Sequence, residues 1–413
     1  MKGFRHLVTH VKKYGRQHQA LYFLALMILF WAIFDGTTTY ITPLIITERG
    51  VSKTLMGIII GTSSVVGAIF DFIMCKVLKK AHFRQIFMLM FGLCFFYLGV
   101  LYVANSVALF VLAMAIWGIY YDLKNFGSFD FVARFVPSEE HASSFGLLQV
   151  FQATGYLIAP ILAGLLIGQT VGKLPFFAAL IVIGIAGMFL LRLLAEEKRS
   201  KTVELTARYN YKGMFQELKL WLSIDKIILP VLLLNTTLCI IDAFFWTVGP
   251  LLAESFRDIH PLAGFFMAAY TLPTLLVGWL VGGVTARFGK KRTAFIALLV
   301  GSGILSLIRY SHNSVMMIVI VFLASFCIAF AWPALKATFA DYISETRRYE
   351  KEIEGLEDFY TNLGYVIGPM TAGIVADRVG NQATFGYLGI FGMIMALVLL
   401  KVTPRKINLP KRF

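Results

Sequence analysis

Charged residues are scarce in this chain of 413 residues. Asp, Glu, Lys and Arg make up 15% of the sequence and hydrophobic residues 58%, whereas soluble domains carry about 25% charged residues. The deficit excludes an ordinary soluble globular protein. Polar stretches are short as well, and the apolar runs between them reach the roughly 20 residues that a bilayer-spanning helix needs. The composition therefore predicts a polytopic membrane protein.

Cysteines and catalytic motifs are also rare. The four cysteines, Cys75, Cys94, Cys239 and Cys327, lie in apolar stretches without metal-ligand spacing, so we expect buried, unpaired thiols. The sequence contains no phosphate-binding loop and no nucleophile elbow of a hydrolase. We expect no enzyme activity, no cofactor and no metal. Any transport against a concentration gradient would then have to be driven by another gradient across the membrane.

Acidic residues are outnumbered by basic ones, 23 to 38, which gives a net charge of +15. The basic residues are unevenly placed: 30 fall in one set of connections between apolar segments and 6 in the other. Because cytoplasmic connections carry the excess of Lys and Arg, both termini are predicted to be cytoplasmic, in a cell (inner) membrane. The net charge reflects topology, and no nucleic-acid partner is expected.

The apolar segments predict an all-α integral membrane protein with twelve spanning helices in two six-helix bundles. The bundles comprise 20–194 and 226–401, joined by a cytoplasmic linker at 195–225 and flanked by basic termini at 1–19 and 402–413. The helices are expected at 20–46, 52–78, 84–104, 107–133, 142–168, 174–194, 226–252, 261–286, 292–310, 314–340, 355–378 and 382–401.

Two acids lie in the middle of such segments. Asp35 precedes Pro43 by eight residues, and the same spacing returns in Asp242 and Pro250, 207 positions later. A carboxylate at mid-membrane is costly unless it faces protein or water. We interpret both acids as substrate or proton contacts. The alternative is a structural carboxylate that accepts hydrogen bonds from Thr or Tyr hydroxyls of a neighbouring helix.

Further repeats extend this pair. The segment Gly155 to Gly164, which contains Pro160, returns as Gly364 to Gly373 with Pro369, 209 positions later. Leu123-Lys124 is echoed by Leu335-Lys336, and Gly67 with Asp71 aligns with the segment that begins at Gly282. The pattern indicates an internal duplication in which helices 1, 2, 4 and 5 correspond to 7, 8, 10 and 11.

These motifs resemble those of the major facilitator superfamily. The stretch from Gly282 to Lys291 is similar to the family's loop signature, with Ala286 in place of the usual acid, whereas the first copy keeps Asp71 but lacks the following Arg and Gly. The helix 5 segment resembles the signature associated with the family's antiporters. The resemblance implies two pseudo-symmetric bundles around a cavity lined by helices 1, 4, 7 and 10, with alternating access.

The resemblance also implies roles for individual residues. Loop and helix-kink positions are expected to act in gating: Gly67, Asp71, Gly282, Arg287, Gly289, Lys290, Gly155, Pro160, Gly364 and Pro369. Polar residues at helical spacing are expected to contact substrate or protons: Asp35, Thr38, Thr39, Thr42, Asp122, Lys124, Asn125, Asn235, Asp242, Trp246 and Lys336.

Two of these assignments are constrained by helix geometry. Asp122 and Lys124 lie about 200° apart at 100° per residue, so they cannot both face one cavity. Lys124 also lies toward the predicted cytoplasmic end relative to Asp35, which disfavours a direct pair. For Lys124 and Lys336 the alternative is a side chain that extends to the cytoplasmic surface.

The sequence thus predicts a secondary transporter of a small molecule, proton-coupled, oriented toward export and monomeric in the bilayer. Alternatives are a uniporter, a lipid or glycolipid flippase of the same fold, or a non-transporting membrane receptor. Asp242 lies next to Ile241, Phe244 and Phe245 in the sequence, and we expect its surroundings to be less hydrated than those of Asp35. Asp242 is therefore predicted to be the stronger candidate for the proton carrier. The acids favour a cationic, zwitterionic or polyhydroxyl substrate, which Asp35 is expected to contact.

The predicted topology is testable by cysteine labelling in a variant whose four native cysteines are replaced. Cysteines at Lys80, Arg292 and Lys406 should react only from the cytoplasm, and one at Arg257 or Asn313 only from outside. Reversed labelling at any of these positions would contradict the predicted helix count.

Overall fold

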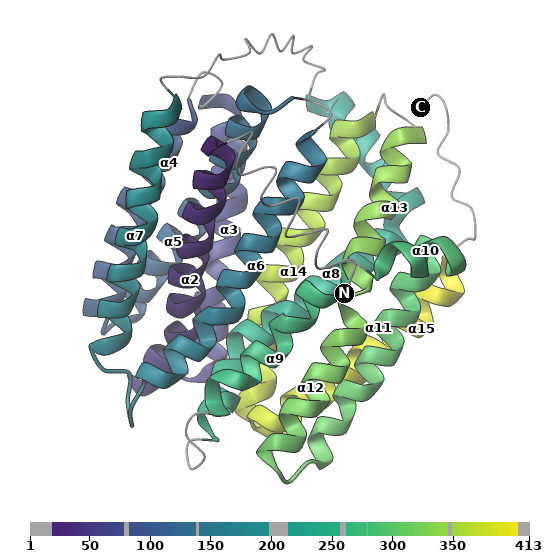
Figure 1. The fold of residues 1–413 in the computed structure, drawn as a ribbon. Helices are drawn as coiled ribbons and strands as arrows, with labels where there is room; N and C mark the ends of the chain where they lie inside the picture. The colour runs from purple at the N-terminus through teal and green to yellow at the C-terminus, as the bar shows by residue number, and fades with distance from the viewer. Residues whose placement is uncertain are drawn as a thin grey trace. The chain divides into compact units, whose positions relative to one another are not determined.

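A computed structural model describes residues 19–77, 82–137, 140–197, 214–256, 262–278, 280–345 and 349–403. All regular structure within these ranges is helical (Figure 1). Nearly all of the predicted basic termini, residues 198–213 of the predicted linker and the side chain of Cys75 lie outside them. The last part of the predicted linker, 214–225, is helical and continues into the helix that was predicted to begin at 226. Of the other cysteines, Cys94 and Cys239 are buried free thiols and Cys327 is a partly exposed one.

The first six helices lie within a few residues of their predicted positions. They are α2 (Gln19–Glu48), α3 (Lys53–Val77), α4 (Phe83–Val103), α5 (Val107–Phe135), α6 (His141–Leu166) and α7 (Leu174–Glu197). The second half contains α8 (Met214–Glu254), α9 (Leu262–Val277), α10 (Val281–Phe288), α11 (Lys290–Ser306), the 3-10 turn η3 (Leu307–Tyr310), α12 (Ser314–Ile328), α13 (Ala331–Glu345), α14 (Glu350–Val379) and α15 (Asn381–Val402).

Two predicted helices of the second half are interrupted. The predicted helix 8 divides into α9 and α10, separated by 278–280, a stretch that begins with Gly278. The predicted helix 10 divides into α12 and α13 at Ala329 and Phe330. Pro333 lacks the N–H that would bond the carbonyl of Ala329, so the break falls where a proline interrupts the helical ladder.

The helices are long and apolar enough for a membrane. Among the described residues, ten could span a bilayer by length and composition, or eleven if α9 and α10 count as one broken span. The predicted helix that is missing from this set is helix 11, which is α14 in the structure. Its first turns are rich in charge, with Glu350, Lys351, Glu352, Glu354 and Glu357. The all-α membrane fold is confirmed, and twelve spans are compatible with it.

The chain divides into two compact units. The first comprises Met1–Val51, Thr62–Thr206 and Arg257–Ala268, and the second comprises Ser52–Gly61, Ala207–Phe256 and Ala269–Phe413. Two helices are therefore shared: the beginning of α3 belongs to the second unit, and the beginning of α9 to the first. The two units are symmetric in this respect, because α3 and α9 correspond to helix 2 and helix 8, which the duplication predicts to be equivalent.

Helix α2 forms the centre of the first unit. It packs against α6 and α7 (Figure 1), and Trp31, Phe34 and Tyr40 are fully buried on it. Its apolar residues surround the helix axis and do not gather on one face, as expected of a helix buried on all sides. In the second unit the corresponding helix, α8, packs against α14.

The duplication is visible in the packing of these helix pairs. A Cβ on Gly155 of α6 would lie 2.6 Å from the Cβ of Ala32 on α2, and one on Gly364 of α14 would lie 2.6 Å from the Cβ of Cys239 on α8. Ala32 and Cys239 are 207 positions apart, like the two acids. Both glycines therefore let equivalent helices approach closely.

A second contact of the same kind appears with its residues exchanged. In the first unit Gly36 of α2 faces Ala159 of α6: a Cβ added to Gly36 would lie 2.7 Å from the Cβ of Ala159. In the second unit Gly368 of α14 faces Ala243 of α8, at 2.5 Å by the same measure. Each crossing has room for one methyl group, which α6 carries in the first unit and α8 in the second.

This exchange predicts a rescue. Gly36→Ala should lower the free energy of unfolding by about 1–3 kcal/mol, because an extra methyl group overpacks the contact with Ala159. Adding Ala159→Gly re-creates the arrangement of the second unit and should restore most of the loss. The midpoint of thermal unfolding in detergent measures both effects, with Ala159→Gly alone as the control. A double variant no more stable than Gly36→Ala would contradict this account.

Candidate functional site

Asp35 is held by three hydrogen-bond donors from two neighbouring helices. Its side chain is buried, with 1% exposed. On α5, the Trp117 indole N–H and the Tyr120 hydroxyl donate to Oδ1 at 2.9 and 2.7 Å. On α6, the Tyr156 hydroxyl donates to Oδ2 at 2.7 Å. Burying a carboxylate is costly unless its oxygens are satisfied, and here α5 and α6 supply the donors.

The threonines of the predicted polar stripe bond mainly within α2. The Thr38 hydroxyl donates to the carbonyls of Phe34 and Asp35, and that of Thr42 donates to the carbonyl of Thr38 and meets the Tyr97 hydroxyl at 3.1 Å. The Thr39 hydroxyl is buried without a hydrogen-bond partner among the described residues.

Asp242 has a matching environment in the second unit. The Tyr270 hydroxyl of α9 donates to Oδ1 at 2.5 Å, and the Tyr365 hydroxyl of α14 donates to Oδ2 at 2.8 Å. The Trp246 indole, one turn along α8, is also a hydrogen-bond donor to this carboxyl group. Phe245 stacks on Tyr270 with ring centroids 3.9 Å apart. Asp242 is partly exposed whereas Asp35 is 1% exposed, so the expectation that Asp242 has the less hydrated surroundings is wrong: packing across helices, and not the neighbours in sequence, determines the exposure.

The two sites share one repeated interaction. Tyr156 and Tyr365 directly follow Gly155 and Gly364 in the duplicated segment, and each donates to the acid of its own unit. The remaining donors are not equivalent in the duplication, because they come from α5 in the first unit and from α9 and α8 in the second. Both tyrosines lie within the repeated segments and were not among the predicted site residues, although their identity in the two copies is a signal that the sequence offers.

Lys124 is a buried cation with neutral partners. Its side chain is 4% exposed, and its ammonium donates to Asn125 Oδ1 at 2.7 Å and Gln152 Oε1 at 3.0 Å. It also lies 5.0 Å from the ring centroid of Trp31 and 4.9 Å from that of Tyr121, which is cation–π distance. Among the described residues it forms no direct pair with Asp35.

Lys336, its counterpart in the duplication, has a carboxylate partner. Its ammonium forms an ion pair with Glu357 of α14, and its side chain is 61% exposed. The equivalent lysines therefore differ in charge environment: Lys336 is neutralised by a carboxylate, and Lys124 contacts amide oxygens and aromatic rings.

Two other predicted site residues serve helix contacts. Asp122 lies against α3, since a Cβ on Gly67 would lie 2.8 Å from its Oδ2. Asp122 and Lys124 thus face different neighbours, as their separation around the helix predicts. Asn235 of α8 donates to the Glu357 carbonyl and to the Thr361 hydroxyl of α14 at 3.3 and 2.7 Å, and its Oδ1 is buried without a partner among the described residues.

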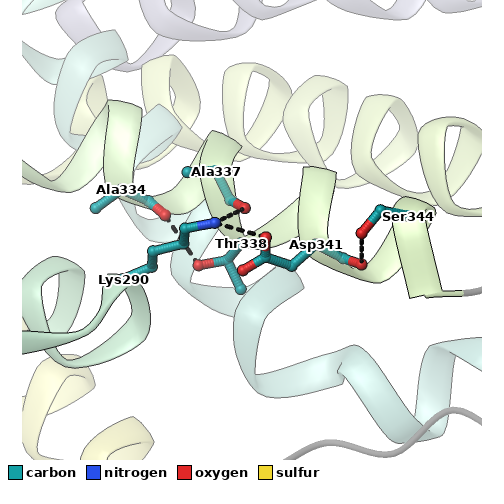
Figure 2. Close-up of polar contacts among 6 residues, drawn as sticks. All are labelled: Lys290, Ala334, Ala337, Thr338, Asp341 and Ser344. Carbon is teal, nitrogen blue, oxygen red and sulfur yellow. Dashed lines mark hydrogen bonds and ion pairs between the residues drawn. The ribbon is translucent and has the colours of Figure 1, made fainter. Parts of the chain in front are cut away.

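The predicted loop signature forms a tight connection between α10 and α11. Gly289 has φ +84°, a conformation that side chains rarely adopt, and it ends one helix and begins the next. The adjacent Lys290 pairs with Asp341 of α13 at 2.5 Å and also bonds the Ala337 carbonyl (Figure 2). Arg287 is exposed, with its guanidinium 5.5 Å from the Phe288 ring.

The first copy of this connection is built differently. Asp130 of α5, near the equivalent of Asp341, accepts from the backbone N–H of Phe83 at 2.9 Å and pairs with Arg134 at 2.7 Å. Gly67 is packed against Asp122, whereas Gly282 has no atom within 4 Å of a would-be Cβ. Asp71 lies near the end of α3 and is partly exposed. In both units an aspartate ties the fourth helix to the start of the third.

The described residues contain no group of three or more His, Cys, Asp or Glu placed to hold a metal ion. The candidate site consists of tyrosine and tryptophan donors around one carboxylate in each unit. Such an array can bind polar small molecules and can exchange a proton at the carboxylate.

Comparison with known proteins identifies a family and relatives that match most of the chain. The model of the Major Facilitator Superfamily matches residues 24–241 and 231–413. The uncharacterized MFS-type transporter YuxJ of Bacillus subtilis (strain 168) is 24% identical over 324 residues, 75% of this chain and 78% of that protein. Multidrug resistance protein 2 of the same organism is 23% identical over 287 residues, 67% and 68% of the two chains.

Solved structures share the fold. The nucleoside transporter NupG has a TM-score of 0.70 at 13% identity, covering 94% of this chain and all of that one. A bacterial homologue of the human lysosomal transporter Spinster, in an inward-facing and occupied conformation, has a TM-score of 0.72 at 13% identity, covering 96% and 99%. At these identities the likeness concerns the fold alone.

The tyrosine donors predict matched stability effects. Tyr156→Phe and Tyr365→Phe should each lower the free energy of unfolding by about 1–3 kcal/mol, because each leaves a carboxylate oxygen short of a donor. Tyr310→Phe is the control, since Tyr310 is 72% exposed. Thermal unfolding in detergent measures the losses.

The same measurement in a double-mutant cycle assigns the loss to the acid. Tyr365→Phe should cost less in an Asp242→Asn background than in the unmodified chain. Equal costs in the two backgrounds would show that the hydroxyl does not act through Asp242.

Proposed function

The chain belongs to the major facilitator superfamily, and from this we propose that it is a secondary active transporter that moves a small molecule by alternating access. The observation that carries the proposal is the pair of carboxylates, Asp35 and Asp242, held by tyrosine donors at equivalent positions in the two units. Protons are the proposed coupling ion, and export is the proposed direction.

Asp242 is the proposed proton carrier. Proton exchange requires contact with water, and Asp242 is partly exposed whereas Asp35 is 1% exposed. Once protonated, the Asp242 carboxyl group can itself donate to a tyrosine oxygen, so the hydrogen bonds survive neutralisation. No lysine or arginine forms an ion pair with Asp242 among the described residues, which leaves the proton as its means of neutralisation.

Asp35 is the proposed organiser of the substrate contacts. It fixes Trp117 and Tyr156, which are partly exposed and can contact a ligand directly. Preorganised side chains bind with a smaller entropic cost. Asp35 therefore acts on the substrate through the groups that it positions, and Thr39 adds a free hydroxyl from the same helix.

Lys124 narrows the substrate chemistry. It is a buried cation without a carboxylate in contact, and its partners Tyr121, Asn125 and Gln152 are partly exposed. An anionic or hydroxyl-bearing group would complete its hydrogen bonds, while the rings offer stacking surface. A zwitterionic or polyhydroxyl substrate with an apolar or aromatic body fits this set. The names of the relatives, a multidrug resistance protein and a nucleoside transporter, are compatible with a small organic substrate.

Transport in proteoliposomes tests these roles. A pH gradient should drive accumulation of the substrate by the unmodified protein. Asp242→Asn should abolish accumulation but retain exchange of labelled for unlabelled substrate, because binding and conformational change survive without the proton. Asp35→Asn should instead weaken binding about 10- to 100-fold, if loss of its charge costs about 1.4–3 kcal/mol of charge-assisted hydrogen bonding.

Asp225→Asn is the matched control, since Asp225 lies on the same helix as Asp242 and accepts from Tyr360 at 2.8 Å. It should leave accumulation unchanged. If Asp242→Asn still concentrates substrate with normal pH dependence, Asp242 is not the proton carrier. If the substrate flux of the unmodified protein does not depend on the pH gradient, a uniporter or flippase is favoured instead.

A further inference from the structure

The beginning of α3 lies directly on the last turns of α14. A Cβ on Gly57 would overlap the carbonyl oxygen of Pro369, and a Cβ on Gly373 would overlap that of Lys53. All four residues belong to the second unit. The glycines therefore allow a contact between the two backbones that any larger residue would prevent.

The duplication repeats this crossing in the first unit. A Cβ on Gly264 of α9 would lie 2.5 Å from the carbonyl oxygen of Pro160 on α6. Gly57 and Gly264 are 207 positions apart, and Pro160 and Pro369 are 209 apart. Each proline-containing helix thus carries a glycine contact with the beginning of a helix that continues into the other unit.

A polar network is added at the crossing of α3 and α14. Asp377, in the last turn of α14, accepts from the backbone N–H of Lys53 at 3.1 Å. Its other oxygen accepts from the backbone N–H and the hydroxyl of Thr54 at 2.7 and 2.6 Å. The first N–H groups of a helix lack partners within it, so Asp377 caps α3 from a distant part of the chain.

Lys53 completes the network in the opposite direction. Its ammonium donates to Asn381 Oδ1 at 2.7 Å and to the Ala376 carbonyl at 3.4 Å. A cation at the C-terminal end of α14 is favoured by the helix dipole, as the Asp377 carboxylate is at the start of α3. Each helix therefore caps the end of the other.

The Asp377 carboxylate has no counterpart at the equivalent position of the first unit. The residue 209 positions before Asp377 is Gly168, which has no side chain. The two crossings thus share their glycine and proline backbone contacts but differ in charge. Only the one between α3 and α14 carries a carboxylate among the described residues.

We propose that Lys53, Thr54, Asp377 and Asn381 form a clasp that must open during the transport cycle. The inference rests on the proposed alternating access. Helix α3 is continuous, and its later residues belong to the first unit. When the clasp opens, the first two turns of α3 lose their polar contacts with α14, and α3 is no longer fixed to this helix of the second unit. The basic-residue pattern places the clasp at the predicted extracellular end.

Spin-label distance measurements test the clasp without requiring a known substrate. In a variant without native cysteines, labels at Arg49→Cys, in the turn before α3, and at Arg378→Cys, in the last turn of α14, flank the clasp. Asp377→Asn should raise the ratio of long to short distances about 5- to 150-fold, the range typical of conformational coupling. Thr54→Val, a milder change, should shift it in the same direction.

Glu48→Gln is the matched control. Glu48 lies at the end of α2 and accepts from the backbone N–H of Val171, both in the first unit. Its substitution should leave the distances unchanged. An unchanged distribution in both Asp377→Asn and Thr54→Val, in protein that elutes as a folded species, would overturn the clasp.

A disulfide separates this inference from the proposed function. Cysteines replacing Thr54 and Asp377 should cross-link, and the cross-link should stop substrate flux until reductant restores it. Full flux with the cross-link formed would overturn the clasp while leaving transport intact. Shifted distances in Asp377→Asn together with no flux in the unmodified protein would support the clasp and overturn the proposed transport function.

Discussion

The structure depends on one carboxylate enclosed between helices in the middle of each unit, buried in the first unit and partly exposed in the second. Neither acid forms an ion pair with a lysine or arginine among the described residues, so each must be satisfied by neutral donors. Tyrosine supplies them, because its hydroxyl extends far enough from one helix to reach the centre of the next. Gly155 and Gly364 then become necessary, since the helices that carry Tyr156 and Tyr365 must approach α2 and α8 closely.

The duplicated scaffold carries unequal chemistry. The acids, the tyrosines after the paired glycines, and the glycine to proline crossings recur in both units. The lysines, by contrast, meet a carboxylate in one unit and neutral groups in the other, and Asp377 faces α3 where its equivalent is Gly168. Backbone packing and the central acids are thus repeated, while the partners of the lysines and the contact of Asp377 are not. This is what a transporter requires if one half handles the coupling ion and the other the substrate.

Much of the fold was predictable because it rests on strong local signals. Apolar length located the helices, and the repeats of Asp35 and Pro160 revealed the duplication. The break near Ala329 follows from Pro333, but proline alone did not distinguish it from the continuous helices that contain Pro160 and Pro369. The partners of Asp35 and the contact of Asp377 with α3 could not be predicted. They depend on helix rotation and on which helices become neighbours, which periodicity within one segment does not determine.

The exchanged pair of small residues has a consequence for the history of the chain. If both units descend from one ancestral segment, the crossing changed from one arrangement, Gly36 with Ala159, to the other, Ala243 with Gly368, or the reverse. A path through two alanines would pass through a clash. The accessible intermediate therefore had glycine on both helices, at a cost of up to about 1 kcal/mol in helix propensity. That intermediate was less stable at this crossing than either present unit, and the lineage that passed through it regained the methyl group on the opposite helix.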